Sequence, residues 1–380
     1  MNQDIRCSSK ELQNQDIRCS SKELRYAHII YTPFTGVGLH GGFRGNQWLN
    51  HRIKIFKNYT LKSLMNQSNQ DFLHWISFRR EEKNNEQIIR LASYLSDLNY
   101  PYIFTFDGLM YWDDKFTDYR LKTQLRNCLM MLWDCWHYKD IRCSSKELQF
   151  KIKQIWKYTW ENKNKTLLDR TKRSLNHIDS IIGHGFDWIY LTRIDSDDMF
   201  HKETVNLIQS EKPQYNKALV FDKGYIYNIQ TGQLGEWHPP TNPPFHTIIF
   251  PGSTFFNPQS YLEYYKNFRT HEDITRIFNC TTLDMHKGQD PAVKNSYMVS
   301  FHGKHISTAW ESSVLRREYH KLKYRGYCYT TSGRNISTHW QSRTTKQKNF
   351  MIGKEFVGEI KDNILKDFGI TIDLYKEEKL

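Results

Sequence analysis

The amino-terminal part of the chain alternates short apolar runs with segments of helical period. Short runs rich in β-branched and aromatic residues are typical of buried strands, and they occur at Ala27–Thr32, Phe72–Phe78 and Pro101–Phe106. Two helical patterns lie between these runs. The first places four apolar residues on one helical face, Leu49, Ile53, Phe56 and Leu64, and the second spans Ile88–Leu98. Strands that alternate with helices predict an α/β fold with a mainly parallel sheet and crossover helices.

A longer helical pattern, from Thr117 to Ile182, predicts a helical insertion after the third strand. The proline-rich stretch Trp237–Phe245 is expected to be a loop, because proline cannot donate to a strand ladder. Near the end of the chain, apolar residues at four-residue spacing predict a last helix capped by Gly369; they are Phe356, Ile360, Ile364 and Phe368. Further strands are predicted at Trp188–Thr192, Lys217–Phe221, Tyr225–Asn228 and Tyr297–Phe301.

No clean linker divides the chain, so we expect one compact domain, residues 26–310, with a tail (1–25) and a C-terminal extension (311–380). The nonapeptide DIRCSSKEL occurs three times, at residues 4–12, 16–24 and 140–148. Three identical copies indicate a recent duplication, and the unit is too short for a solenoid repeat. A docking peptide or redox tag is one interpretation. We favour the other, a neutral insertion into tolerant segments.

Charge and cysteine usage narrow the classes of function. The formal net charge of +13 favours anionic partners, and aromatic residues, at 15%, suit the stacking of bases or sugar rings. The amino terminus is polar and no apolar run is long enough to span a bilayer, so we expect a cytoplasmic protein, with peripheral contact to the cytoplasmic membrane face left open. The seven cysteines form no CxxC pair, which argues against a structural zinc site.

The most specific motif is FDWIYLTRIDSDDMF, residues Phe186–Phe200. An apolar strand ends here in Asp195, Asp197 and Asp198, with Arg193 just ahead. In open α/β sheets, ligands bind at the carboxyl ends of the strands. Carboxylates in an Asp-Ser-Asp spacing are suited to Mg²⁺ or Mn²⁺, which in turn binds a diphosphate. A solvated turn is the alternative, and we favour the metal site.

A second candidate, Gly36–Gly41, matches the GxGxxG dinucleotide fingerprint after the first strand. The fingerprint requires a helix at once and an acid about 20 residues on. Here the loop continues and the second strand ends in Arg79 and Arg80. We therefore consider an oxidoreductase a weak hypothesis, and a loop over a diphosphate a fair alternative.

A third candidate is the segment Leu315–Asn349, in which basic residues and aromatic rings alternate around a single acid, Glu318. This composition is typical of single-stranded nucleic-acid binding. It also suits an anionic lipid surface, a phosphorylated acceptor or an ordinary solvated face. A non-catalytic nucleic-acid-binding protein is therefore the alternative function.

Taken together, several blocks resemble the rhamnosyltransferase family, a GT-A-type glycosyltransferase group. The resemblance covers about Tyr26 to Trp310, and the Arg52–Phe78 block is the most telling part. The other blocks are HIIYTPF, TRIDSDDMFHKETV, GYIYNIQTG and QDPAV with MVSFHGKHIST. The resemblance implies a GT-A-like, Rossmann-type sandwich and transfer of a sugar, with rhamnose as the candidate, from a nucleotide-sugar donor to a glycan or glycolipid acceptor in polysaccharide biosynthesis. No nucleic-acid partner is expected on this interpretation.

The resemblance also implies roles for individual residues. Asp195 and Asp197 are expected to ligate Mn²⁺ or Mg²⁺, with Asp198 beside them and His302 completing the set. Asp290 is the expected catalytic base, because QDP precedes the strand that ends at His302, and Asp273 is the second choice. Contacts to the donor are expected from Thr32, Phe34, Arg193 and Asp195. Arg79 and Arg80 depart from the family, which often has an acid for the base there, and this puts the donor nucleotide in doubt.

Overall fold

The structure is a computed structural model that describes residues 24–35, 45–78, 82–107, 149, 153, 156, 167–221, 224–228, 232–237, 245–265, 274–283, 297–301 and 355–371. Several predicted features lie outside these residues: the three nonapeptides, the Gly36–Gly41 loop, Arg79 and Arg80, and the basic segment 315–349. Among the described helices, none is both long and apolar enough to cross a bilayer.

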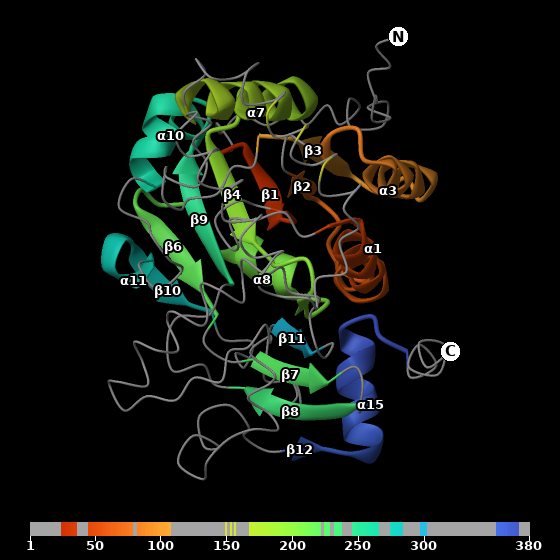
Figure 1. Ribbon diagram of the computed structural model, residues 1–380. Helices are drawn as coiled ribbons and strands as arrows, with labels where there is room; N and C mark the ends of the chain where they lie inside the picture. The colour runs from red at the N-terminus through yellow and green to blue at the C-terminus, as the bar shows by residue number, and fades with distance from the viewer. Residues whose placement is uncertain are drawn as a thin grey trace, which may run out of the picture.

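A seven-stranded sheet forms the centre of the fold, in the order β10-β6-β9-β4-β1-β2-β3 (Figure 1). Only β9 runs antiparallel to its neighbours, so the predicted α/β fold with a mainly parallel sheet is confirmed. The strands are β1 (Tyr26–Pro33), β2 (Leu73–Ser77), β3 (Tyr102–Thr105), β4 (Trp188–Arg193), β6 (Lys217–Val220), β9 (His246–Pro251) and β10 (Asn279–Thr282). The order β3-β2-β1-β4 is that of a doubly wound sheet, and its topological switch point lies between β1 and β4.

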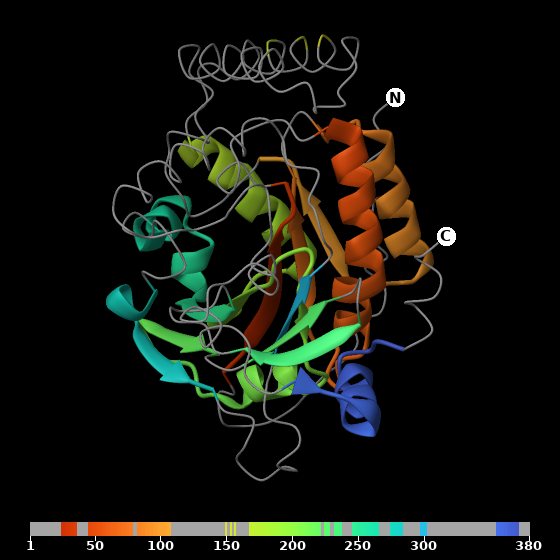
Figure 2. The same ribbon diagram turned by 60° about the horizontal axis from the view of Figure 1, so that its bottom comes forward.

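Helices cover both faces of this sheet (Figure 2). Because side chains alternate along a strand, Ile30 packs into one core and its neighbour Ile29 into the other. The first core includes residues of α1 (Gly45–Ile55), α3 (Glu86–Asp97) and α8 (Thr204–Ser210). The second includes residues of α7 (Leu167–Ile182), α9 (Gly252–Phe255), α10 (Pro258–Tyr265) and α11 (Ile274–Ile277).

The helix predicted around Leu49–Leu64 is confirmed with one difference. It is α1, a π-helical turn η1 (Phe56–Thr60) and α2 (Leu61–Met65) in direct succession. The four predicted apolar residues are all buried in the first core. The next helix, α3, begins where the Asn85 side chain accepts a hydrogen bond from the Gln87 backbone N–H, which is a normal N-cap.

A second, five-stranded sheet has the order β12-β8-β7-β11-β5 and lies beside the C-terminal helix α15 (Gly358–Asp367) (Figure 1). Its strands are β5 (Met199–Phe200), β7 (Gly224–Asn228), β8 (Gln233–Trp237), β11 (Tyr297–Phe301) and β12 (Glu355–Phe356). A third core joins this sheet and α15 to the end of α1 and to η1, through Ile55, Tyr59, Met199, Ile364 and Phe368 among others.

The predicted last helix is confirmed, together with its glycine cap. The Gly369 N–H donates to the Lys366 carbonyl and the Ile370 N–H to the Leu365 carbonyl, each at 3.0 Å, and Gly369 has φ +71°. This is a Schellman motif. The predicted apolar face is wrong in two places, because Phe356 belongs to β12 and Ile360 is half exposed.

Candidate functional site

The acid turn, which we define as residues 195–198, follows β4 at the switch point of the sheet. The last pairing of β1 with β4 places Tyr31 beside Arg193, and the Ile194 N–H donates to the Tyr31 carbonyl at 3.0 Å. The turn is closed by the Asp198 N–H, which donates to the Asp195 carbonyl at 3.2 Å. The predicted carboxylates therefore lie at the carboxyl edge of the sheet, where open α/β sheets bind ligands.

Arg193 and Asp195 form an ion pair at this edge. The guanidinium Nη2 lies 2.9 Å from Asp195 Oδ1; the arginine side chain is 3% exposed and the aspartate side chain 22%. Tyr31 lies next to them, and burial raises the pKa of its phenol, against opposing contributions from a Ser77 hydrogen bond and from Arg193. The Asp195 charge raises this pKa further. Of the two side chains in the ion pair, that of Asp195 is the one that reaches solvent.

Asp197 has a different environment, because Arg52 of α1 reaches across to the acid turn. Arg52 Nε donates to the Ser196 hydroxyl at 2.8 Å, and its Nη1 pairs with the Asp197 carboxylate. Both side chains of the ion pair are largely buried. No sequence motif indicates this role for Arg52, although it is the first residue of the Arg52–Phe78 block.

The acid turn is a candidate site for a divalent cation. Carboxylate oxygens are the ligands that Mg²⁺ and Mn²⁺ prefer, so the donor chemistry fits. Within the described ranges, however, no three His, Cys, Asp or Glu side chains gather into a group that could hold a metal ion. Asp195 and Asp197 each face an arginine instead, and Asp198 is 5% exposed. The three-aspartate metal site therefore stays a prediction, and Asp195 is its most accessible member.

The structure buries the side chains of Thr32 and Phe34 on the face of the first core, which α1, α3 and α8 cover. The Thr32 hydroxyl is hydrogen-bonded to His74 Nε2 at 2.8 Å, and the Phe34 ring packs against Phe56 and Phe78. The Phe34 N–H donates to the Ser77 carbonyl. Neither side chain is exposed, so we assign neither a contact with a donor.

The remaining predicted site residues, Asp273, Asp290 and His302, lie outside the residues that the structure describes. The strand before His302 is described. β11 pairs antiparallel with β5, with Tyr297 beside Phe200 and Met298 beside Met199. Because β5 directly follows the acid turn, the carboxyl end of β11 runs toward that turn.

A further carboxylate, Asp107, follows β3 at the same edge of the sheet. Its Oδ1 accepts a hydrogen bond from Arg173 at 2.6 Å and its Oδ2 from the Ser174 hydroxyl at 2.8 Å. The Asp107 carbonyl lies 3.4 Å from Arg170 Nη1. These contacts join the end of β3 to α7, and they account for the burial of this acid.

Two histidines are buried in the first core. His28 Nε2 lies 2.7 Å from the Thr192 hydroxyl and His74 Nδ1 lies 3.0 Å from the Tyr100 hydroxyl. Burial lowers the pKa of both rings to about 3. The amide nitrogen of Gln209 lies 3.2 Å from His28 Nδ1, an arrangement that suits a neutral ring with an acceptor at this atom.

Comparison with models of known protein families finds no family that matches this chain, and comparison with curated proteins finds no match either.

Proposed function

We propose that this protein is a metal-dependent glycosyltransferase of the GT-A type, which moves a sugar from a nucleoside diphosphate donor to a glycan or glycolipid acceptor with inversion. One observation carries the proposal: an acid turn follows β4 at the topological switch point of a mainly parallel sheet, with Asp195 partly exposed there. Ligands of open α/β sheets bind at such a point. The motif resemblance described above supports the choice of reaction and of a rhamnose-like sugar.

In this proposal the two aspartates have different tasks. Asp195 holds the divalent cation, and Arg193 limits the movement of that carboxylate through the 2.9 Å ion pair. Asp197 is held by Arg52 and orients the turn. Asp198 and His302 are the candidates for further ligands of the cation. A bound Mg²⁺ or Mn²⁺ would neutralise the charge that develops on the leaving diphosphate.

The reaction also needs a group that removes the proton from the acceptor hydroxyl. A carboxylate is suited to this role as a general base. Asp290 is our first candidate and Asp273 the second. Asp290→Asn and Asp273→Asn distinguish them, because loss of turnover with retained donor binding is expected for the base only.

The proposal is tested by thermal unfolding of the protein with a panel of nucleoside diphosphates and nucleotide sugars, with and without Mn²⁺. A ligand that binds only the native state stabilises it by about 2.7 kcal/mol at 100 times its dissociation constant. We expect a Mn²⁺-dependent shift with one nucleotide. Asp195→Asn should abolish the shift, whereas Asp97→Asn, the same change at an exposed site of α3, should retain it.

The absence of a shift with every donor in the presence of Mn²⁺ would refute the proposal. A shift that Asp195→Asn leaves unchanged would refute the assignment of the acid turn.

A further inference from the structure

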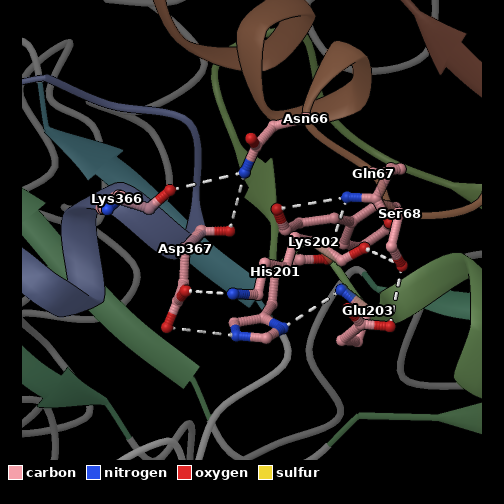
Figure 3. Close-up of polar contacts among 9 residues, drawn as sticks. Asn66, Gln67, Ser68, His201, Lys202, Glu203, Lys366 and Asp367 are labelled. Atoms are coloured by element: carbon pink, nitrogen blue, oxygen red, sulfur yellow. Dashed lines mark hydrogen bonds and ion pairs between the residues drawn. The ribbon is translucent and has the colours of Figure 1, made fainter.

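The C-terminal end of α15 lies against the segment that leaves the acid turn (Figure 3). That segment is β5, followed by His201 and Lys202. The Lys202 N–H donates to the Asp367 carbonyl at 2.9 Å, and Lys202 Nζ lies 2.8 Å from Asp367 Oδ1. His201 Nε2 lies 3.6 Å from the other carboxylate oxygen. One residue of α15 thus contacts both residues that follow β5.

The loop after α2 contacts both the end of α15 and the segment after β5 (Figure 3). Asn66 Nδ2 donates to the Asp367 carbonyl at 3.2 Å. Gln67 Nε2 donates to the His201 carbonyl at 2.8 Å, and the Ser68 N–H donates to the Lys202 carbonyl at 2.8 Å. The backbone after β5 is therefore fixed from two sides, by α15 and by this loop.

Packing fixes the end of α15 in a single position. Phe368 is fully buried, and its ring centroid lies 5.6 Å from that of His201 and 5.9 Å from that of Tyr225. A Cβ atom added to Gly369 would lie 2.9 Å from the Lys62 carbonyl oxygen, closer than such atoms approach. Together with the Schellman motif, this close approach places the helix end directly against α2 and requires a glycine at this position.

The charges at this contact are matched. Burial by itself would raise the pKa of Asp367, but hydrogen bonds and charge from His201 and Lys202 outweigh it and lower that pKa. Glu203, the next acid along the chain, bonds to Ser68 and Asn206 instead. Asp367 is therefore an ionised carboxylate at neutral pH, and its negative charge lies beside the ammonium group of Lys202.

We propose that the end of α15 acts as a clasp that positions the acid turn, and that Asp367 is its positioning residue. The turn is held at its middle by Arg52, and the two residues that follow β5 are held by Asp367. The order of the turn then depends on the last described helix of the chain. The consequence for donor binding rests on the proposed function, whereas the ordering of the turn does not.

Hydrogen exchange of the full chain tests the ordering. Asp367→Ala removes the carboxylate, and Asp367→Asn keeps its shape and removes its charge. We expect amides of residues 194–203 to exchange about tenfold faster in Asp367→Asn, because the neutral side chain loses the ion pair with Lys202. Glu359→Gln, the same loss of charge at an exposed site of α15, should leave these amides unchanged.

Two outcomes would overturn the clasp. Faster exchange confined to α15 would show that the helix end moves without the acid turn, and equally faster exchange in β1 and β2 would show a general loss of stability. If Asp367→Ala does not fold, the exchange rates of residues 194–203 in Asp367→Asn alone decide the test. A separate Mn²⁺ titration followed by electron paramagnetic resonance measures the site itself. Weaker Mn²⁺ binding by Asp367→Asn supports the clasp, whereas no binding by the wild-type protein would refute the proposed function and leave the exchange result standing.

Discussion

Acidification should destabilise this fold because two histidines are buried as neutral rings. His28 and His74 have pKa values of about 3 in the folded protein, against 6.5 for an ordinary histidine. Below pH about 6.5 the unfolded chain binds protons at these rings and the folded protein does not. The stability that the neutral rings provide is therefore complete above the unfolded pKa and is lost as the pH falls toward about 3.

The size of the effect follows from the two pKa values. For one ring, lowering the pH from about 7.5 to about 5 removes about 2 kcal/mol from the free energy of unfolding. The two rings together remove about 4 kcal/mol, a large part of the roughly 5–15 kcal/mol that stabilises a typical domain. For each ring the slope should average about 0.8 kcal/mol per pH unit over this range, and it should approach about 1.4 kcal/mol per pH unit only near pH 5, between the two pKa values.

Urea denaturation at the two pH values measures this loss. His74→Gln should reduce the difference between the two pH values by about 2 kcal/mol, whatever its effect on stability at pH about 7.5. His184→Gln is the matched control, because the His184 side chain is 85% exposed. The reasoning is refuted if His74→Gln and the wild-type protein lose the same stability on acidification.

Two substitutions test other parts of the structure. Asp197→Asn leaves the buried Arg52 without its carboxylate, so we expect a loss of about 3–5 kcal/mol in urea denaturation, and a loss below about 1 kcal/mol would show that the pair is a surface one. Gly252→Ala should lower the free energy of unfolding by about 1–3 kcal/mol, because a Cβ there would lie 2.0 Å from the Phe186 carbonyl oxygen. Gly183→Ala, at φ +80° but in open space, measures the backbone strain alone, and an equal cost for both glycines would contradict the steric argument.

Much of the sheet could be predicted from local patterns. Strands β1, β2, β3, β4, β6, β7 and β11 lie within a residue or two of their predicted ranges, because short apolar runs between polar segments indicate buried strands. β9 was not predicted, although His246–Pro251 has a strand-like composition after the proline-rich stretch. Its antiparallel direction depends on pairing with β4 and β6, which no local pattern contains.

The candidate site was predicted in position but not in detail. The acids after β4 lie at the sheet edge, as a strand that ends in carboxylates predicts. Thr32 and Phe34 share the strand face of Ile30, and helices bury that face. How deeply the end of β1 is buried on this face depends on where α1 and α3 pack, so the alternation along β1 alone did not exclude these two side chains from the site.

The sequence by itself determined most of the strands of the central sheet, several helices, and that an acid turn follows a buried strand, because periodicity and turn chemistry act between neighbouring residues. Only the tertiary structure decided that Asp197 pairs with Arg52, that Asp195 keeps part of its side chain in solvent, and that Asp367 reaches the segment after β5. Charge pairing and solvent exposure depend on which distant segments meet in the folded chain. These contacts give Asp195, Asp197 and Asp367 different surroundings.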